Sequence, residues 1–224
     1  MPRIARTVLP GVALHVVQRG NNRAACFFSD GDRLAYLRLL LEYSRQARCS
    51  VHAYCLMTNH VHLLVTPSEP DACAQLMKSV GQHYVEHVNR VHGRTGTLWE
   101  GRFRSSVAAS ADYVLACYRY IELNPVRAGL SSHPREHQWS SHGYNAEGRL
   151  DTLVTPHPVY AALEEDPERR RRAYRGLFDA PMDDGVVSEI RSAARNGRAL
   201  GSERRSRGRP PENRDRPLIS QIEK

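Results

Sequence analysis

Lysine is almost absent from this chain of 224 residues, which contains two lysines against 30 arginines and 24 acidic side chains. Arginine therefore supplies nearly all of the positive charge, and the formal net charge is +8. A basic excess of this size favours a phosphate-bearing partner such as nucleic acid. Apolar residues make up 41% of the chain, which is enough to build a core and excludes a wholly disordered protein.

Long apolar runs are also missing, because no stretch approaches the 18 or more residues that a membrane span needs. Pro10, His15 and Arg19 interrupt the first twenty residues before a signal-peptide core develops, so we expect no membrane association and a cytoplasmic location. Cysteine is scarce and forms no C-x-x-C pair, which argues against a disulfide framework or a cysteine zinc site. We expect free thiols at Cys26, Cys49, Cys55, Cys73 and Cys117.

Within the first 130 residues, segments with the hydrophobic period of a strand alternate with segments that have the period of a helix. Short β-rich runs predict strands, and longer runs with a 3.6-residue period predict helices. The expected strands cover 12–18, 50–57, 60–66 and 102–108, and the expected helices cover 30–48, 71–91 and 110–123. Up to the fourth strand, this order is the split β-α-β arrangement of an α+β, ferredoxin-like fold, in which an antiparallel sheet carries helices on one face.

The rest of the chain gives weaker signals. We divide the sequence into a domain at 1–145, a helical extension at 146–200 and a basic tail at 201–224, which we expect to be disordered. Within the extension, helices are expected near 156–178 and 183–194. Four histidines have no spacing typical of metal ligands and are predicted to be surface residues: His133, His137, His142 and His157.

Two histidines share one face of the third predicted strand. His60 and His62 are two residues apart, so their imidazoles point the same way and could bind a metal together. The H-x-H pattern alone is more often structural than metal-binding, and a third ligand is required.

A stripe of polar residues runs along the helix predicted at 110–123. Tyr113, Cys117, Tyr120 and Asn124 are spaced four, three and four residues apart, which places them on one side. Tyr120 and Asn124 could thus offer a nucleophile and an oxygen ligand to a metal held by the histidines. The alternative is that the tyrosines are core residues and Asn124 only ends the helix before Pro125.

Three segments together carry a resemblance to a known family. MTNHVHLLV, LWEGRFRSS and CYRYIELNPVRAGL resemble the single-tyrosine HUH transposases of bacterial insertion sequences, and especially the REP-associated tyrosine transposases that act on repetitive extragenic palindromes. The resemblance covers residues 8–145, and 196–203 is also similar. It implies a ferredoxin-like HUH domain in which His60, His62 and Asn124 bind Mg²⁺ or Mn²⁺ and Tyr120 is the nucleophile.

Some alternatives remain open for these roles. Tyr118 lies about 200° around the helix from Tyr120 and cannot share the face of Asn124. Tyr113 and Tyr120 could instead mimic the tyrosine pair of two-tyrosine enzymes. Because Pro125 biases Asn124 away from helical dihedral angles, a water or Glu122 could replace Asn124 as the third ligand.

The chemistry that the resemblance implies suits these residue types. A divalent ion polarises the phosphate and stabilises the leaving 3′ oxygen, and a phenol with a pKa of about 10 is a better nucleophile than a sugar hydroxyl. The resulting 5′-phosphotyrosine stays reactive, so that a DNA 3′-hydroxyl can reseal the strand without ATP.

The expected substrate is single-stranded or hairpin DNA, because a buried tyrosine cannot easily reach a phosphate in an intact duplex. Arginines and aromatic residues would supply charge and stacking. The DNA-binding candidates are Arg19, Arg23, Trp99, Arg102, Phe103, Arg104 and Arg127, and Arg207 and Arg209 form an Arg-Gly-Arg that could enter a narrow A·T minor groove.

The sequence therefore predicts a metal-dependent DNA transposase or endonuclease with strand-transferase activity, active as a monomer or homodimer and associated with the nucleoid when bound to DNA. Two other classes remain: a non-catalytic protein that binds palindromic hairpins, and a metal-dependent nuclease that uses water. The three differ in their need for Tyr120.

Overall fold

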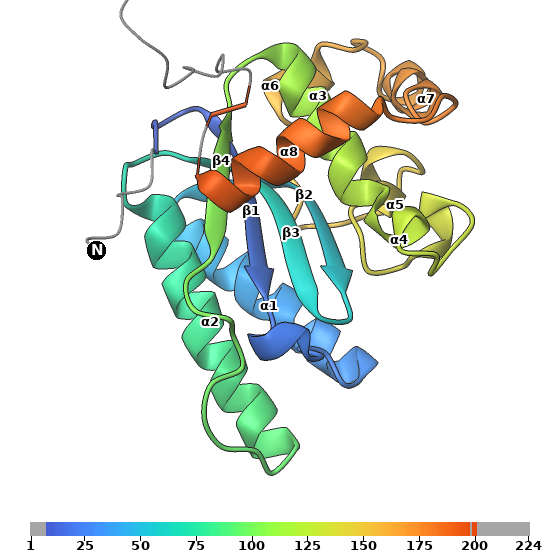
Figure 1. The fold of residues 1–224 in the computed structure, drawn as a ribbon. Helices are drawn as coiled ribbons and strands as arrows, with labels where there is room; N and C mark the ends of the chain where they lie inside the picture. The colour runs from blue at the N-terminus through green and yellow to red at the C-terminus, as the bar shows by residue number, and fades with distance from the viewer. Residues whose placement is uncertain (1–7, 198, 201–224) are drawn as a thin grey trace, which may run out of the picture.

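The computed structural model describes residues 8–197 and 199–200, and its centre is one antiparallel sheet (Figure 1). The strands are β1 (Ala13–Arg19), β2 (Cys49–Met57), β3 (His60–Pro67) and β4 (Arg104–Ala108), in the spatial order β2-β3-β1-β4. Strands β2 and β3 form a hairpin around Thr58 and Asn59. This order, with helices between β1 and β2 and between β3 and β4, is the predicted ferredoxin-like arrangement.

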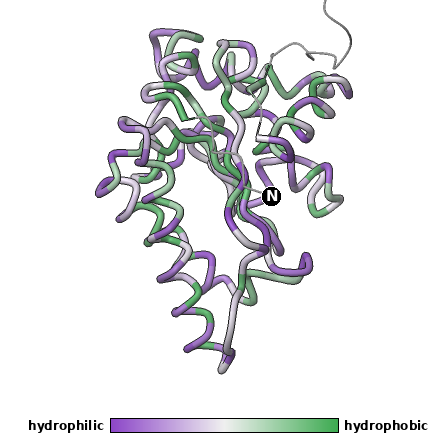
Figure 2. The backbone as a smooth tube through the Cα atoms, turned by 60° about the vertical axis from the view of Figure 1, so that its left-hand side comes forward, coloured by the Kyte–Doolittle hydropathy of each residue, from purple (hydrophilic) through white to green (hydrophobic). Residues whose placement is uncertain are grey.

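The helices α1 (Asp30–Gln46) and α2 (Ala72–Val91) pack on one face of the sheet. Helix α1 begins with a capping box, in which Ser29 and Asp32 exchange side-chain and backbone hydrogen bonds. Alternate strand residues, such as Leu14 and Val16 of β1 and Leu63 of β3, join both helices in one buried core. In Figure 2, hydrophilic and hydrophobic residues alternate along α2, as expected for a helix with one face on the core.

The other strand residues face a second helical layer. Here α3 (Ala111–Glu122) and α8 (Asp184–Asn196) pack on the sheet, and α8 contacts β4, β1 and α3 (Figure 1). Leu64 of β3, Cys117 of α3 and Ile190 of α8 belong to this second core. The two helices of the ferredoxin-like unit thus cover one face as predicted, and the segments after β4 cover the opposite face.

Short elements complete the second layer. They are η1 (Asn21–Arg23), α4 (Asn124–Arg127), η2 (Pro134–Glu136), α5 (His142–Asn145), α6 (Pro158–Ala161) and α7 (Pro167–Gly176). Pro125 ends α3 as predicted, but it then lies in the first turn of α4. The segment after residue 145 is tied to the sheet by backbone hydrogen bonds from Thr155 to Val51 and from Leu200 to Val107.

All five cysteines are free thiols, as predicted, and all are buried. No helix in the described part of the chain is long and apolar enough to cross a membrane. The predicted tail at 201–224, with Arg207 and Arg209, lies outside the described residues.

Candidate active site

A cavity of about 560 Å³ lies between the sheet and α8. It brings together seven residues that the sequence singled out: Arg19, Arg23, His60, His62, Arg102, Arg104 and Tyr120. Sequence reasoning missed four other lining residues, which are His15, Glu100, Arg191 and Arg195. Glu100 is the only acidic residue among the described residues that line this cavity, so its wall is strongly basic.

His60 is oriented by Asn59, the residue before it in the hairpin turn. The Nδ2 of Asn59 donates to the carbonyl of Arg23 at 2.9 Å, which turns its Oδ1 towards the Nδ1 of His60, 2.6 Å away. Because this amide oxygen can only accept, the Nδ1 of His60 carries the proton. The Nε2 of His60 therefore keeps a free lone pair.

His62 is held by a histidine from the neighbouring strand. In the register of β1 with β3, Val17 is opposite His62, and His15 shares the face of Val17. The Nε2 of His15 lies 2.9 Å from the Nδ1 of His62, and the two rings stack with centroids 5.2 Å apart. A proton on the Nδ1 of His62 satisfies this contact and leaves the Nε2 of His62 as an electron-pair donor.

Burial keeps these three imidazoles neutral. It lowers the pKa of His60 to about 4, with a further decrease from nearby Arg19, and the pKa of His15 to about 3, with a contribution from Arg127. Burial also holds the pKa of His62 well below its usual value, assisted by the neighbouring His15 and His60. Neutral imidazole is the form that binds a metal ion.

Tyr120 lies beside the histidine cluster and is only 6% exposed. Its ring is edge-on to His15 and His62, with centroids 5.5 and 5.6 Å apart. The guanidinium of Arg127 lies 4.0 Å from the ring centroid of Tyr120 and donates to its carbonyl at 2.7 Å. Arg127 itself does not line the cavity. Its contacts with the ring and the carbonyl of Tyr120 hold this tyrosine in position.

The two competing tyrosines lie elsewhere. Tyr118 is fully buried against Tyr160 and Tyr174, and its hydroxyl accepts a hydrogen bond from the backbone of His157. Tyr113 donates to a carboxylate oxygen of Glu189 at 2.6 Å. Neither side chain lines the cavity, which leaves Tyr120 as the tyrosine next to the histidines.

Asn124 is one turn after Tyr120, but the structure does not bring it into the cavity lining. Its Nδ2 donates to the carbonyls of Tyr120 and Ile121 at 3.0 and 3.3 Å, because α3 ends just before it. The Oδ1 of Asn124 accepts no hydrogen bond within the described residues. The amide nitrogen thus donates to carbonyl groups at the end of α3. The amide oxygen is the atom of this side chain that could bind a cation.

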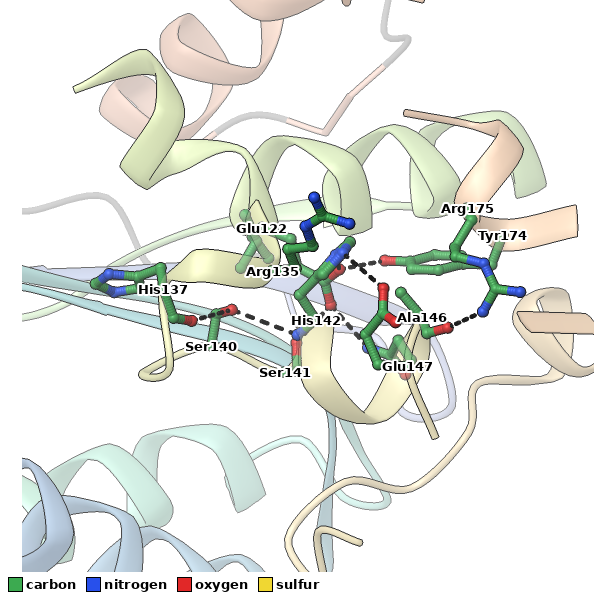
Figure 3. A network of polar contacts seen from close by, with 12 residues as sticks. Glu122, Arg135, His137, Ser140, Ser141, His142, Ala146, Glu147, Tyr174 and Arg175 are labelled. Atoms are coloured by element: carbon green, nitrogen blue, oxygen red, sulfur yellow. Dashed lines mark hydrogen bonds and ion pairs between the residues drawn. The ribbon is translucent and has the colours of Figure 1, made fainter. Parts of the chain in front are cut away.

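Glu122 lies within a network of polar contacts (Figure 3), so it cannot serve as the alternative metal ligand. Its carboxylate is fully buried on the side of α3 that faces α5 and α7. One oxygen accepts from Ser141 and Asn145, and the other accepts from His142 and Tyr174, at 2.7 to 2.9 Å. Four donors therefore use both oxygens and hold α3 against the extension.

The same network corrects the prediction that four histidines lie on the surface. His142 is 1% exposed, because its Nδ1 donates to Glu122 inside this network. His137 is half-buried, and its ring lies 3.1 Å from the carbonyl of Leu56. The side chains of His133 and His157 accept backbone hydrogen bonds at the starts of η2 and α6.

Trp99, which the sequence predicted to stack on DNA, is largely buried. It is 7% exposed, packs near Tyr36 and Tyr84, and directs its indole N–H to the carbonyl of Gly81. Phe103 packs against the same core on the far side of the sheet from the histidines. Trp99 and Phe103 therefore face away from the histidines, Arg104 lines the cavity beside them, and Arg102 reaches both sides.

The donor set fits a divalent ion held by two histidines. No cluster of three or more His, Cys, Asp or Glu residues among the described residues could hold a metal. However, His60 and His62 have rings 4.9 Å apart, and each has its Nδ1 beside a supporting side chain. Two neutral imidazoles on one face of β3 suit a divalent ion with open coordination positions, and Asn124 lies outside the cavity lining.

A basic cavity with paired histidines and one adjacent tyrosine, on an α+β fold, defines the class as a tyrosine transposase. Residues 9–124, more than half of the chain, match the family model described as IS200-like transposase, and the chain belongs to this family. Its members are enzymes that cleave DNA. The predicted resemblance to single-tyrosine transposases is thereby confirmed.

A solved structure shows the same fold. A REP-associated tyrosine transposase bound to a REP hairpin has 15% identity and a TM-score of 0.56, covering 70% of this chain and 93% of that chain. A putative transposase from Deinococcus radiodurans R1 has 18% identity and a TM-score of 0.37, covering 50% of this chain and 91% of that one. No curated protein matches the chain.

Proposed function

We propose that this protein is a metal-dependent transposase that cuts and rejoins single-stranded or hairpin DNA through a 5′-phosphotyrosine on Tyr120. Repetitive extragenic palindromes are the substrate class that we propose, and the REP hairpin bound to the structural neighbour supports this choice. The observation that carries the proposal is the position of Tyr120, edge-on to His62 within one basic cavity.

His60 and His62 would hold Mg²⁺ or Mn²⁺ through their Nε2 atoms, with the Oδ1 of Asn124 as the proposed third donor. A bound divalent cation polarises a phosphate oxygen and stabilises the negative charge that develops on the leaving oxygen. Asn59 and His15 fix the ring orientations of the two histidines. Burial keeps these rings neutral, so binding of a cation needs no prior loss of a proton.

Tyr120 would then attack the phosphorus atom. A bond forms between the phenolic oxygen and phosphorus while the bond from phosphorus to the 3′ oxygen breaks, the phenol loses its proton, and the leaving oxygen gains one. The product is a phosphotyrosine on the 5′ side and a free 3′-hydroxyl. Attack by a DNA 3′-hydroxyl reverses these bond changes and rejoins a strand, because the ester bond energy is retained.

The arginines of the cavity support a nucleic-acid substrate. Arg19 ends β1 and Arg23 ends η1, Arg102 lies just before β4 and Arg104 begins it, and Arg191 and Arg195 belong to α8. Their guanidinium groups surround the histidines and would bind the phosphates of one strand. Tyr120 and both histidines belong to one copy, which supports a site complete in the monomer, with a homodimer as the alternative.

The test is formation of a covalent adduct. Purified protein is incubated with labelled single-stranded palindromes and Mn²⁺ or Mg²⁺, and a DNA-bound band is scored on a denaturing gel. The adduct should form in the wild type, disappear in Tyr120→Phe and persist in the matched Tyr118→Phe. Cleavage without an adduct would indicate a nuclease that uses water, and binding without cleavage would indicate a binding protein; either result overturns the proposal.

A further inference from the structure

A second hollow, of about 650 Å³, lies on the opposite face of the sheet from the histidines. We call it the α2 groove, because α2 forms one wall and the segment 97–103 forms the other. Along this segment the side chains alternate. Trp99 and Phe103 line the α2 groove, Glu100 and Arg104 line the catalytic cavity, and Arg102 lines both.

The floor of the α2 groove is open at Gly81. A Cβ atom at this position would lie 3.6 Å from the Nε2 of Gln18 and 3.7 Å from the Nε1 of Trp99. These are ordinary van der Waals distances, so a Cβ atom fits there without a clash, and a longer side chain at this position would stand in the lining of the groove. The glycine thus leaves the amide of Gln18 and the edge of Trp99 facing the hollow.

Gln18 provides an unused hydrogen-bonding group in this floor. Its side chain is 6% exposed, and its Oε1 is buried with no hydrogen-bond partner in the described part of the chain. An unpaired buried amide oxygen is unfavourable, and rotation of the Gln18 amide towards the groove would let an N–H group of a ligand satisfy it. Nucleobases present such donors and acceptors on their edges and have flat apolar faces.

Positive charge lies where the groove meets the catalytic cavity, because Arg102 lines both hollows. Along α2, Lys78 and Glu86 line the groove with opposite charges. A strand whose phosphate occupies the catalytic cavity would cross this boundary with its backbone beside Arg102. The next unpaired base would then lie over the α2 groove.

We propose that the α2 groove binds one unpaired nucleobase of the DNA strand that occupies the catalytic cavity, with the amide of Gln18 reading the edge of the base. This inference rests on the proposed function. The base next to the cleaved phosphate would then be selected on the face of the sheet that lies opposite the histidines.

The first experiment measures binding without metal. Hairpin oligonucleotides with an abasic nucleotide at each unpaired position are titrated by fluorescence anisotropy. One abasic position should weaken binding by the wild type roughly 5- to 100-fold, the effect of losing one stacked base. Gly81→Leu should weaken binding of intact DNA by the same factor, and the abasic nucleotide should then cause no further loss.

Three variants separate this role from a structural one. Gly81→Ala should raise the melting temperature, since alanine favours the helix, and it shows that the position tolerates a side chain. Gly31→Leu, at an exposed position in α1, is the matched control and should bind DNA like the wild type. Gln18→Leu should bind abasic DNA normally but lose the preference among the four bases at the critical position.

One result would overturn this inference, and a different result would overturn the proposed function. Equal affinities and equal abasic penalties in the wild type and Gly81→Leu would overturn it, and the covalent adduct on Tyr120 would then still support the proposed function. A wild type that forms no adduct with any oligonucleotide of the panel would overturn the proposed function itself, whatever the α2 groove binds.

Discussion

The Nε2 of His15 lies 2.9 Å from the Nδ1 of His62, across the pairing of β1 with β3. The two rings stack at an angle of 13°, and His15 is 1% exposed. His15 is therefore held by the core and cannot turn away from His62. This contact gives a proposed metal ligand a fixed ring plane before any ion binds.

Removal of His15 should weaken metal binding without removing a ligand. We expect His15→Ala to lower the affinity for Mn²⁺ about 10- to 100-fold, the usual effect of losing a supporting contact of a metal-bound histidine. His15→Gln should restore part of the loss, because its amide oxygen can accept from His62. Calorimetric titration with Mn²⁺ measures both, and unchanged affinity in His15→Ala would show that His62 needs no such support.

Arg191 of α8 should contribute one phosphate contact. It lines the catalytic cavity and also a neighbouring hollow formed with Arg19, Arg23 and His60. Arg191→Ala should weaken DNA binding and reduce the slope of log affinity against log salt concentration by about 1. Arg172→Ala removes an exposed arginine of α7 and serves as the control. An unchanged slope for Arg191→Ala would place this arginine outside the DNA path.

The sequence predicted the elements better than it predicted the contacts between them. The strand and helix periods and the spacing of His60, His62 and Tyr120 are local properties, so they could be read from the chain. The contact of His15 with His62 depends on strand register, which a single sequence does not provide. The role of Arg191 depends on how α8 packs across β1 and β4, which amphipathicity alone does not determine.

Burial was the second source of error. Trp99 follows a glycine-rich loop and precedes arginines, which favours a surface position, but its ring packs in the core beside α2 and only its edge borders the α2 groove. His142 has no sequence signal for burial, because its partner Glu122 is twenty residues earlier in the chain. Both errors concern polar or aromatic side chains whose environment is set by tertiary contacts.

The network around Glu122 should be a large contributor to stability. Glu122→Gln replaces one acceptor oxygen with an NH₂ group that faces two donors, so we expect the free energy of unfolding to fall by about 2–5 kcal/mol. Urea denaturation measures this loss. Glu164→Gln changes an exposed acid and should have an effect below about 0.5 kcal/mol. Equal stability of the two variants would mean that the four donors find other partners.

His52 should make stability depend on pH, away from the catalytic cavity. It is 3% exposed, its Nδ1 lies 2.7 Å from the carbonyl of Thr155, and its Nε2 lies 2.8 Å from the hydroxyl of Thr66. Burial lowers the pKa of His52 from 6.5 to about 4, and the nearby His157 adds to the decrease. The neutral ring is thus the form that the folded protein accommodates.

Between pH 6.5 and 4, the unfolded chain therefore binds a proton at His52 that the folded chain does not. The contribution of neutral His52 is fully present above pH 6.5 and decreases as the pH falls, by about 3 kcal/mol in total at pH 4. His52→Gln can still donate to Thr155 and accept from Thr66, but it does not titrate. Urea denaturation of both proteins at several pH values should show a steeper loss for the wild type below pH 6.5 and parallel curves above it. Curves that stay parallel down to pH 4 would mean that His52 is protonated equally in the folded and unfolded states.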